Sequence, residues 1–310
     1  MGFVLYEEPQ MEEPVLICSW SGIGNIGLVA VDTLQGQVSA KEMGEIEPWY
    51  FFDPRKATVK DGHLHELEFP KSKFYYQNLP QKNAVFFVGE EQPGQMGKMH
   101  ASGEKAYQMA SMVLDVAEKM GIKKIYTSGA CVAAVHHQVK PRVIAVASSD
   151  KLLQETKTIP NVYSMGEATE EGGEGVITGL NGLLLAMAKK RGLEAACLMG
   201  EIPDWLSRAP FPYPRASQSV MEAFSHLLGA NLDFSFFEKR AEEIDKVIDK
   251  LYEKFPDKVK KQYDERKMER QAGPITKEEA EWMKAHLDDF LKNLPQKQGD
   301  DDDDDQQKPS

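Results

Sequence analysis

The sequence predicts an α/β protein with a largely parallel sheet that helices cover on both faces. From Val15 to about Gly200, short apolar runs alternate with stretches of helical periodicity, and glycines stand at several of the junctions. Such alternation is typical of parallel sheets, whose strands are buried on both sides. The chain has 310 residues, of which 41% are hydrophobic, so it can form one large domain of this class or two smaller ones.

Apolar runs predict the strands, and the spacing between them predicts the helices. In the helix predicted over 102–120, Ala106, Met109 and Val113 recur at helical spacing, and Gly121 supplies the stop. The other predicted helices are 27–34, 178–191 and 215–228, and the predicted strands are 15–18, 85–88, 122–127, 143–147 and 193–199.

Residues 45–80 predict a small antiparallel section. The run 63–69 alternates between apolar and polar residues, and Asp61-Gly62 just before it is a typical hairpin turn. The preceding residues 38–46 contain Lys41, Glu42 and Gly44, so we do not expect a buried strand there.

The composition changes after about Asp204. Ser235 and Glu238 predict a capping box, and an apolar stripe over 237–255 predicts a helix that packs on the main domain or on a sister subunit. Thr276 and Glu279 predict a second capping box. We therefore expect an α/β core domain over residues 1–230, a helical extension over 231–295 and a disordered acidic tail over 296–310.

Composition excludes several classes of function. Six aspartates at 300–305 supply half of the net charge of −12, and no basic stripe appears, which disfavours nucleic-acid binding. We expect no membrane span, because no run of about 18 apolar residues occurs, and the N-terminus lacks the pattern of a signal peptide. Cys18, Cys131 and Cys197 lie in apolar settings typical of reduced thiols, so we expect a cytoplasmic protein.

A glycine-rich turn follows the first predicted strand. Gly22, Gly24 and Gly27 match the spacing of the dinucleotide fingerprint, between a strand and a helix. The fingerprint also needs an acidic residue at the end of the next strand. Glu45 and Glu47 stand near the expected distance, but residues 38–46 do not read as a buried strand. We therefore expect no nicotinamide cofactor. Either the glycines let helix and strand pack closely, or the turn holds another ligand.

A second glycine-rich turn opens the helix at 178, and acidic residues follow several strands. Glu90, Asp150 and Glu201 each come after a predicted strand, and ligands of open α/β sheets bind beyond the carboxyl ends of the strands. The alternative is that these side chains cap helices or lie in solvated loops. The candidate ligand-binding residues are Ser21, Gly22, Gly24, Asn25, Gly27, Glu90, Gln92, Gly129, Thr178, Gly179, Asn181 and Glu201.

The sequence does not predict a metal site or a bound cofactor. His63 and His65 share a strand face but have no evident third ligand, and the adjacent His136 and His137 are expected to point apart. Cys131, near Gly129, is the one candidate for a catalytic thiolate, and its apolar surroundings favour a buried thiol instead.

Four segments together resemble the proteasome assembly chaperone 2 family, over about residues 15–251. They are Trp20-Ser-Gly-Ile-Gly-Asn-Ile-Gly-Leu-Val-Ala30, Gly89-Glu-Glu-Gln-Pro93, Gly175-Val-Ile-Thr-Gly-Leu-Asn-Gly-Leu-Leu-Leu185 and Arg191-Gly-Leu-Glu-Ala-Ala-Cys-Leu-Met-Gly-Glu-Ile-Pro203. The resemblance implies a three-layer α/β/α sandwich with a mostly parallel mixed sheet, similar to purine nucleoside phosphorylases. It also implies a homo-oligomer and, for some relatives, chaperone action on proteasome subunits.

The end of the chain departs from that resemblance. Family members that dock on proteasome rings can end in a hydrophobic residue, a tyrosine and one more residue, whereas this sequence ends Gln306-Gln-Lys-Pro-Ser310. Docking through such a tail is therefore not expected.

Two classes of function remain. One is a binding or assembly protein with a glycine-lined cleft and a protein client such as proteasome subunits. The other is an enzyme or sensor for a nucleoside-like or phosphorylated small molecule. A phosphorylase should present Arg or Ser side chains to phosphate, and no basic cluster joins the candidates Ser19, Ser21 and Arg208. We therefore favour binding over catalysis.

Overall fold

A computed structural model describes residues 2–94, 103–168 and 173–272. Residues 1–267 form one compact unit, and the second unit, 268–310, lies almost wholly outside the described residues. The capping box predicted at Thr276 and the acidic tail also lie outside them. Within the described part of the chain, no helix has the length and apolar character needed to cross a bilayer.

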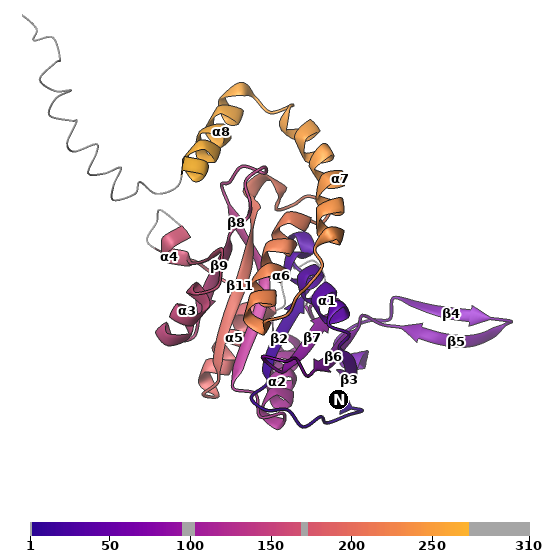
Figure 1. The fold of residues 1–310 in the computed structure, drawn as a ribbon. Coiled ribbons are helices and arrows are strands. Elements are labelled where there is room, and N and C mark those ends of the chain that lie inside the picture. Colours follow the sequence, from indigo (N-terminus) through magenta and orange to yellow (C-terminus); the bar gives the residue numbers. More distant parts are fainter. Residues whose placement is uncertain (1, 95–102, 169–172, 273–310) are drawn as a thin grey trace, which may run out of the picture. The chain divides into compact units, whose positions relative to one another are not determined.

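The centre of the molecule is a nine-stranded mixed sheet (Figure 1), which confirms the predicted fold class. Its strand order is β1-β3-β6-β7-β2-β8-β11-β9-β10, and the four central strands β7, β2, β8 and β11 are parallel. The strands are β1 (Phe3–Leu5), β2 (Val15–Trp20), β3 (Lys41–Ile46), β6 (Ser72–Gln77), β7 (Ala84–Gly89), β8 (Lys124–Ala133), β9 (Val143–Ala147), β10 (Val162–Ser164) and β11 (Glu194–Pro203).

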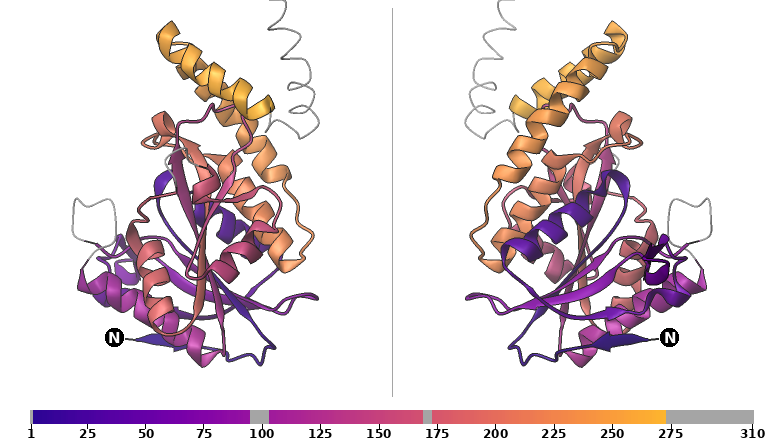
Figure 2. Two further views of the ribbon diagram at one scale, coloured as in Figure 1. Left: turned by 90° about the vertical axis from the view of Figure 1, so that its left-hand side faces the viewer. Right: turned by 90° about the vertical axis from the view of Figure 1, so that its right-hand side faces the viewer.

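Helices cover both faces of the sheet, as the two further views in Figure 2 show. Alternate residues of β2 explain why: Ile17 belongs to the apolar cluster that includes residues of α1, α3 and α6, while Leu16 and Cys18 belong to the cluster that includes residues of α2 and α5. The helices are α1 (Ile26–Gln37), α2 (Glu104–Lys119), α3 (Asp150–Lys157), α4 (Met165–Ala168), α5 (Gly179–Lys190), α6 (Pro214–Leu228), α7 (Ser235–Tyr252) and α8 (Asp257–Ala272), with short 3-10 turns at Ile23–Asn25, Pro48–Tyr50 and Asp204–Leu206.

The antiparallel section contains the predicted hairpin and one strand that was not predicted. Strands β4 (Lys56–Lys60) and β5 (His63–Glu68) pair around Asp61-Gly62, whose φ angles of 51° and 78° suit the turn. The expectation for residues 38–46 is wrong, because β3 lies there with Met43 and Ile46 buried. Its Gly44 is no strand breaker: a Cβ atom there would lie 2.3 Å from the carbonyl oxygen of Val4 on neighbouring β1.

The C-terminal stripe packs within the chain. Phe237 and Ile248 on α7 are buried in the same cluster as α1 and α6, so this part of the stripe covers the body of the protein itself. The predicted capping box at Ser235 is wrong. Phe234 is the capping residue, while the amide and hydroxyl of Ser235 both donate to the carboxylate of Asp233.

Candidate functional site

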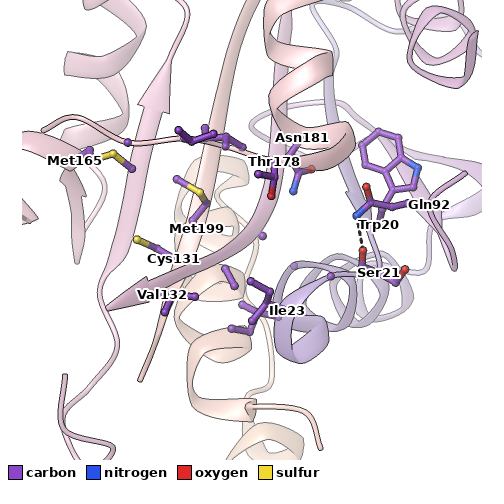
Figure 3. A pocket seen from close by; sticks show the side chains of 18 of the residues that line it. Trp20, Ser21, Ile23, Gln92, Cys131, Val132, Met165, Thr178, Asn181 and Met199 are labelled. Atoms are coloured by element: carbon purple, nitrogen blue, oxygen red, sulfur yellow. Dashed lines mark hydrogen bonds between the residues drawn. The ribbon is translucent and has the colours of Figure 1, made fainter. Parts of the chain in front are cut away.

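A cavity of about 340 Å³ lies at the carboxyl edge of the parallel strands (Figure 3). The two glycine-rich turns meet there, since Gly22 and Gly27 line it from one side and Thr178 and Asn181 from the other. The floor comes from the second half of β8, including Gly129. Helix α5 leads into β11, which runs in the same direction as β2 and β8, so α5 begins near the carboxyl edge of these strands, where the turn after β2 also lies.

Gln92 ties the two turns together. Its Nε2 donates to the carbonyl oxygen of Ser21, at 2.7 Å, and its Oε1 accepts from the backbone amide of Leu180, at 3.0 Å. Gly179 makes room for this contact: its φ is +74°, and a Cβ atom there would lie 2.6 Å from Oε1 of Gln92. Gln92 thus holds the start of α5 at a fixed place over the end of β2.

Two more glycines let side chains and helices approach β8. The Nδ2 of Asn181 donates to the carbonyl oxygen of Ser128, at 2.9 Å, and a Cβ atom on Gly129 would lie 2.9 Å from that nitrogen. On the opposite face a Cβ atom on Gly27 would lie 2.5 Å from the carbonyl carbon and oxygen of Ser128. Gly27 therefore serves close packing of α1 on the sheet, which was one of the two alternatives for this turn.

The first glycine-rich turn does not have the structural context of a dinucleotide-binding motif. Gly24 and Asn25 have φ angles of 58° and 48°, and Oδ1 of Asn25 accepts from the amide of Gly22, at 3.3 Å. The neighbours of β2 in the sheet are β7 and β8. The strand that follows α1 in sequence, β3, is antiparallel to β6 and lies away from the place where the fingerprint's acidic residue would stand.

Several predicted residues lie outside the cavity. Glu90 pairs with Arg55, at 2.7 Å, and Glu201 is buried inside β11, where it accepts from the amide of Arg142, at 2.8 Å. Asp150 follows β9, which runs antiparallel to β11, so it lies at the opposite edge of the sheet. Gly24, Asn25 and Gly179 support the two turns but do not line the cavity.

The cavity also contains residues that sequence reasoning missed. Most of them are apolar, and in the sequence they look like ordinary core residues. Only the three-dimensional positions of the strand ends show that they line a cavity. They are Trp20, Ile23, Ile26, Ala130, Val132, Met165, Gly175, Val176, Ile177 and Met199, together with the acidic Glu174. Cys131, the candidate thiolate of the sequence analysis, lines the cavity as well.

The lining favours holding a ligand over activating a nucleophile. Burial, together with the nearby Glu201 carboxylate, raises the pKa of the Cys131 thiol to about 11, so Cys131 is protonated at neutral pH. The polar side chains that remain on the cavity wall include the hydroxyls of Ser21 and Thr178. They can bind an uncharged polar group, with apolar side chains around it.

The histidines do not add a metal centre to this site. His136 and His137 do not point apart as expected, because they lie in a loop after β8 where strand alternation does not apply, and their rings stack. Within the part of the chain that the structure describes, no group of three or more metal-binding side chains comes together.

Comparisons with known proteins cover most of this chain. A model of the PAC2 family matches residues 16–252. An uncharacterized protein of Methanocaldococcus jannaschii is 26% identical over 252 residues, which are 81% of this chain and 87% of that protein.

Solved structures share the fold. PbaB of Pyrococcus furiosus, described as an archaeal proteasome activator, has a TM-score of 0.66 and 25% identity, covering 80% of this chain and 97% of its own. PbaA of the same organism, an archaeal homolog of proteasome-assembly chaperone, has a TM-score of 0.59 and 19% identity over 87% and 99% of the two chains. A Mycobacterium tuberculosis proteasome-assembly chaperone homologue has a TM-score of 0.61 and 17% identity over 80% and 99%.

Proposed function

Because the chain belongs to the PAC2 family, we propose that it is a cytoplasmic binding and assembly protein that acts on proteasome subunits and works as a homo-oligomer. The observation that carries this proposal is the likeness to PbaB, which extends over 97% of that archaeal proteasome activator. The protonated state of Cys131 in the cavity also favours binding over covalent catalysis.

The test mixes the purified protein with separately produced proteasome α and β subunits of its source organism. We expect a stable complex with a subunit or an assembly intermediate by native mass spectrometry. We also expect a changed rate at which peptidase activity appears as rings assemble. No complex and an unchanged assembly and peptidase rate would contradict the proposal.

The cavity supports a second candidate function, a sensor or enzyme for a nucleoside-like or phosphorylated small molecule. The supporting observation is that Gln92 fixes both glycine turns beside one cavity. The test measures melting temperature with adenosine, inosine, nucleotides and inorganic phosphate. A ligand of this site should raise the melting point of the wild type and have a smaller effect on Thr178→Val. Thr58→Val, on the β4–β5 hairpin, is the matched control.

A further inference from the structure

The hairpin of β4 and β5 is an arm that extends from the body of the protein (Figure 1). It forms a two-stranded sheet of its own, separate from the nine-stranded sheet. A lone two-stranded hairpin is marginally stable in water, because it cannot bury a face. An arm of this kind gains stability when something else covers it.

One face of the arm is apolar. Ala57 lies opposite Leu67, and Val59 lies opposite Leu64. The irregularity between Thr58 and Val59 lets Leu64 and Leu67, three residues apart, lie on the same face. The exposed fractions are 63% for Val59, 65% for Leu64 and 37% for Leu67, so the body of the protein leaves this face largely open.

The other face carries charges that differ between the two strands. Strand β4 contributes Lys56 and Lys60, and β5 contributes Glu66 and Glu68. Lys56 and Glu68 pair with each other within the arm, at 2.7 Å. Lys60 and Glu66 make no ion pair with any residue that the structure describes. One positive and one negative charge are therefore available to a neighbour.

The outer edges of β4 and β5 are open for pairing, and charge decides which edges fit. Pairing β4 with β4 of a second copy opposes lysines, and pairing β5 with β5 opposes glutamates; like charges opposite each other destabilise a sheet. Pairing β5 with β4 opposes Glu66 to Lys60. We propose that the arm joins copies of this chain edge to edge, with β5 of one copy against β4 of the next.

This inference rests on the self-association proposed above and names its surface. Antiparallel pairing of β5 with β4 makes neighbouring arms point the same way. Such a head-to-tail contact closes into a ring when the rotation between copies permits. Val59, Leu64 and Leu67 of neighbouring arms then lie on the same face of the combined sheet, where apolar side chains of adjacent strands contact one another across the junction.

The experiment uses two charge reversals, Lys60→Glu and Glu66→Lys, in the full chain. Each places like charges at the proposed junction. We expect each variant to raise the concentration for half-assembly about tenfold, measured by analytical ultracentrifugation. An equimolar mixture of the two should assemble nearly as well as the wild type, because the charges are again opposite between alternate copies. Lys189→Glu, an exposed reversal on α5, is the matched control and should have no effect.

The outcomes separate this inference from the proposed function. The proposal that the arm joins copies of this chain is overturned if the wild type stays monomeric or if the variants assemble like the wild type. Absent rescue in the mixture also overturns it. Loss of proteasome-subunit binding with intact arm-dependent assembly overturns only the chaperone proposal. Because the arm is separate from the main sheet, melting temperatures of all variants should match the wild type at a concentration where the wild type is also monomeric. Leu64→Ser should weaken assembly without unfolding the protein.

Discussion

The imidazole rings of His136 and His137 stack on each other, with centroids 4.3 Å apart and planes inclined by 22°. Both residues are buried, and each Nε2 faces a carboxylate from a C-terminal helix. His137 faces Asp249 on α7, at 2.8 Å, and His136 faces Asp264 on α8, at 3.3 Å. The ring of Tyr252 packs against both imidazoles. The histidine pair therefore connects the loop after β8 with both helices.

Stability should fall in mild acid because of this pair. Burial lowers the pKa of both histidines, and for His136, where the neighbouring imidazole adds to burial, to about 4. Below about pH 6.5 the two histidines are protonated in the unfolded chain but stay neutral in the folded protein. The free energy of unfolding therefore decreases as pH falls from about 6.5 to about 4. The loss is about 1.4 kcal/mol for each unit of lowered pKa. Urea unfolding across this range measures it.

His136→Gln should flatten this pH dependence. The exposed pair His63 and His65 on the arm provides the control, since His63→Gln with His65→Gln should leave the slope as in the wild type. Equal slopes in His136→Gln and the wild type would rule out the buried pair as the cause. The acid response also reflects nearby charges on α7 and α8, which include Asp245, Asp249, Asp264 and Lys267.

Gly27→Ala should destabilise the fold by about 1–3 kcal/mol, because the new methyl group meets the rigid backbone carbonyl of Ser128. Gly36→Ala is the matched control in the same helix, where nothing lies within 4 Å of the added Cβ atom. That change should instead stabilise α1 by up to about 1 kcal/mol. Thermal unfolding compares the two, and equal effects would contradict the packing role of Gly27.

Gln92→Ala should cost about 1–3 kcal/mol, since the amide of Leu180 and the carbonyl oxygen of Ser21 each lose a partner. Protection of the Leu180 amide from hydrogen exchange should fall with it. Gln35→Ala removes a partly exposed glutamine whose Nε2 donates to Asp32 within α1, and should change stability by less than about 0.5 kcal/mol. Unchanged exchange at Leu180 in Gln92→Ala would show that the two turns hold without this bridge.

Cys131 should react slowly with iodoacetamide near neutral pH. Its raised pKa, about 11, means that the thiolate fraction grows about tenfold for each pH unit up to that value. Alkylation followed by mass spectrometry between about pH 7 and pH 10 tests this, with Cys131→Ser as the control. A fast reaction at neutral pH would reveal an activated thiolate and would reopen catalysis in the cavity.

Much of the fold was predictable because buried parallel strands read as short apolar runs. Residues 15–18 and 85–88 lie in β2 and β7 for this reason. Strand β3 was not predicted because it lies next to the short edge strand β1. Its exposed residues Lys41 and Glu42 are typical of a loop, and Gly44 is typical of a strand break. Only the close approach of β1 explains that glycine.

The candidate site was predictable only where the direction and the end of the neighbouring strand could be inferred correctly from the sequence. The glycine turns follow or precede parallel strands, and they meet. Asp150 was misplaced because residues 143–147 read as a strand but carry no sign that β9 runs antiparallel to β11. Glu201 was misplaced because β11 continues to Pro203, and a buried glutamate that bonds a backbone amide looks in sequence like a strand end.

The position of β2 at the centre of the sheet has a consequence for synthesis of the chain. Val15 pairs with Ala84 on one side and with Lys124 on the other, so both partners of β2 leave the ribosome long after it does. Contacts so distant in sequence form slowly. Until β8 emerges, the nascent chain displays an apolar strand with an open edge, a surface prone to aggregation.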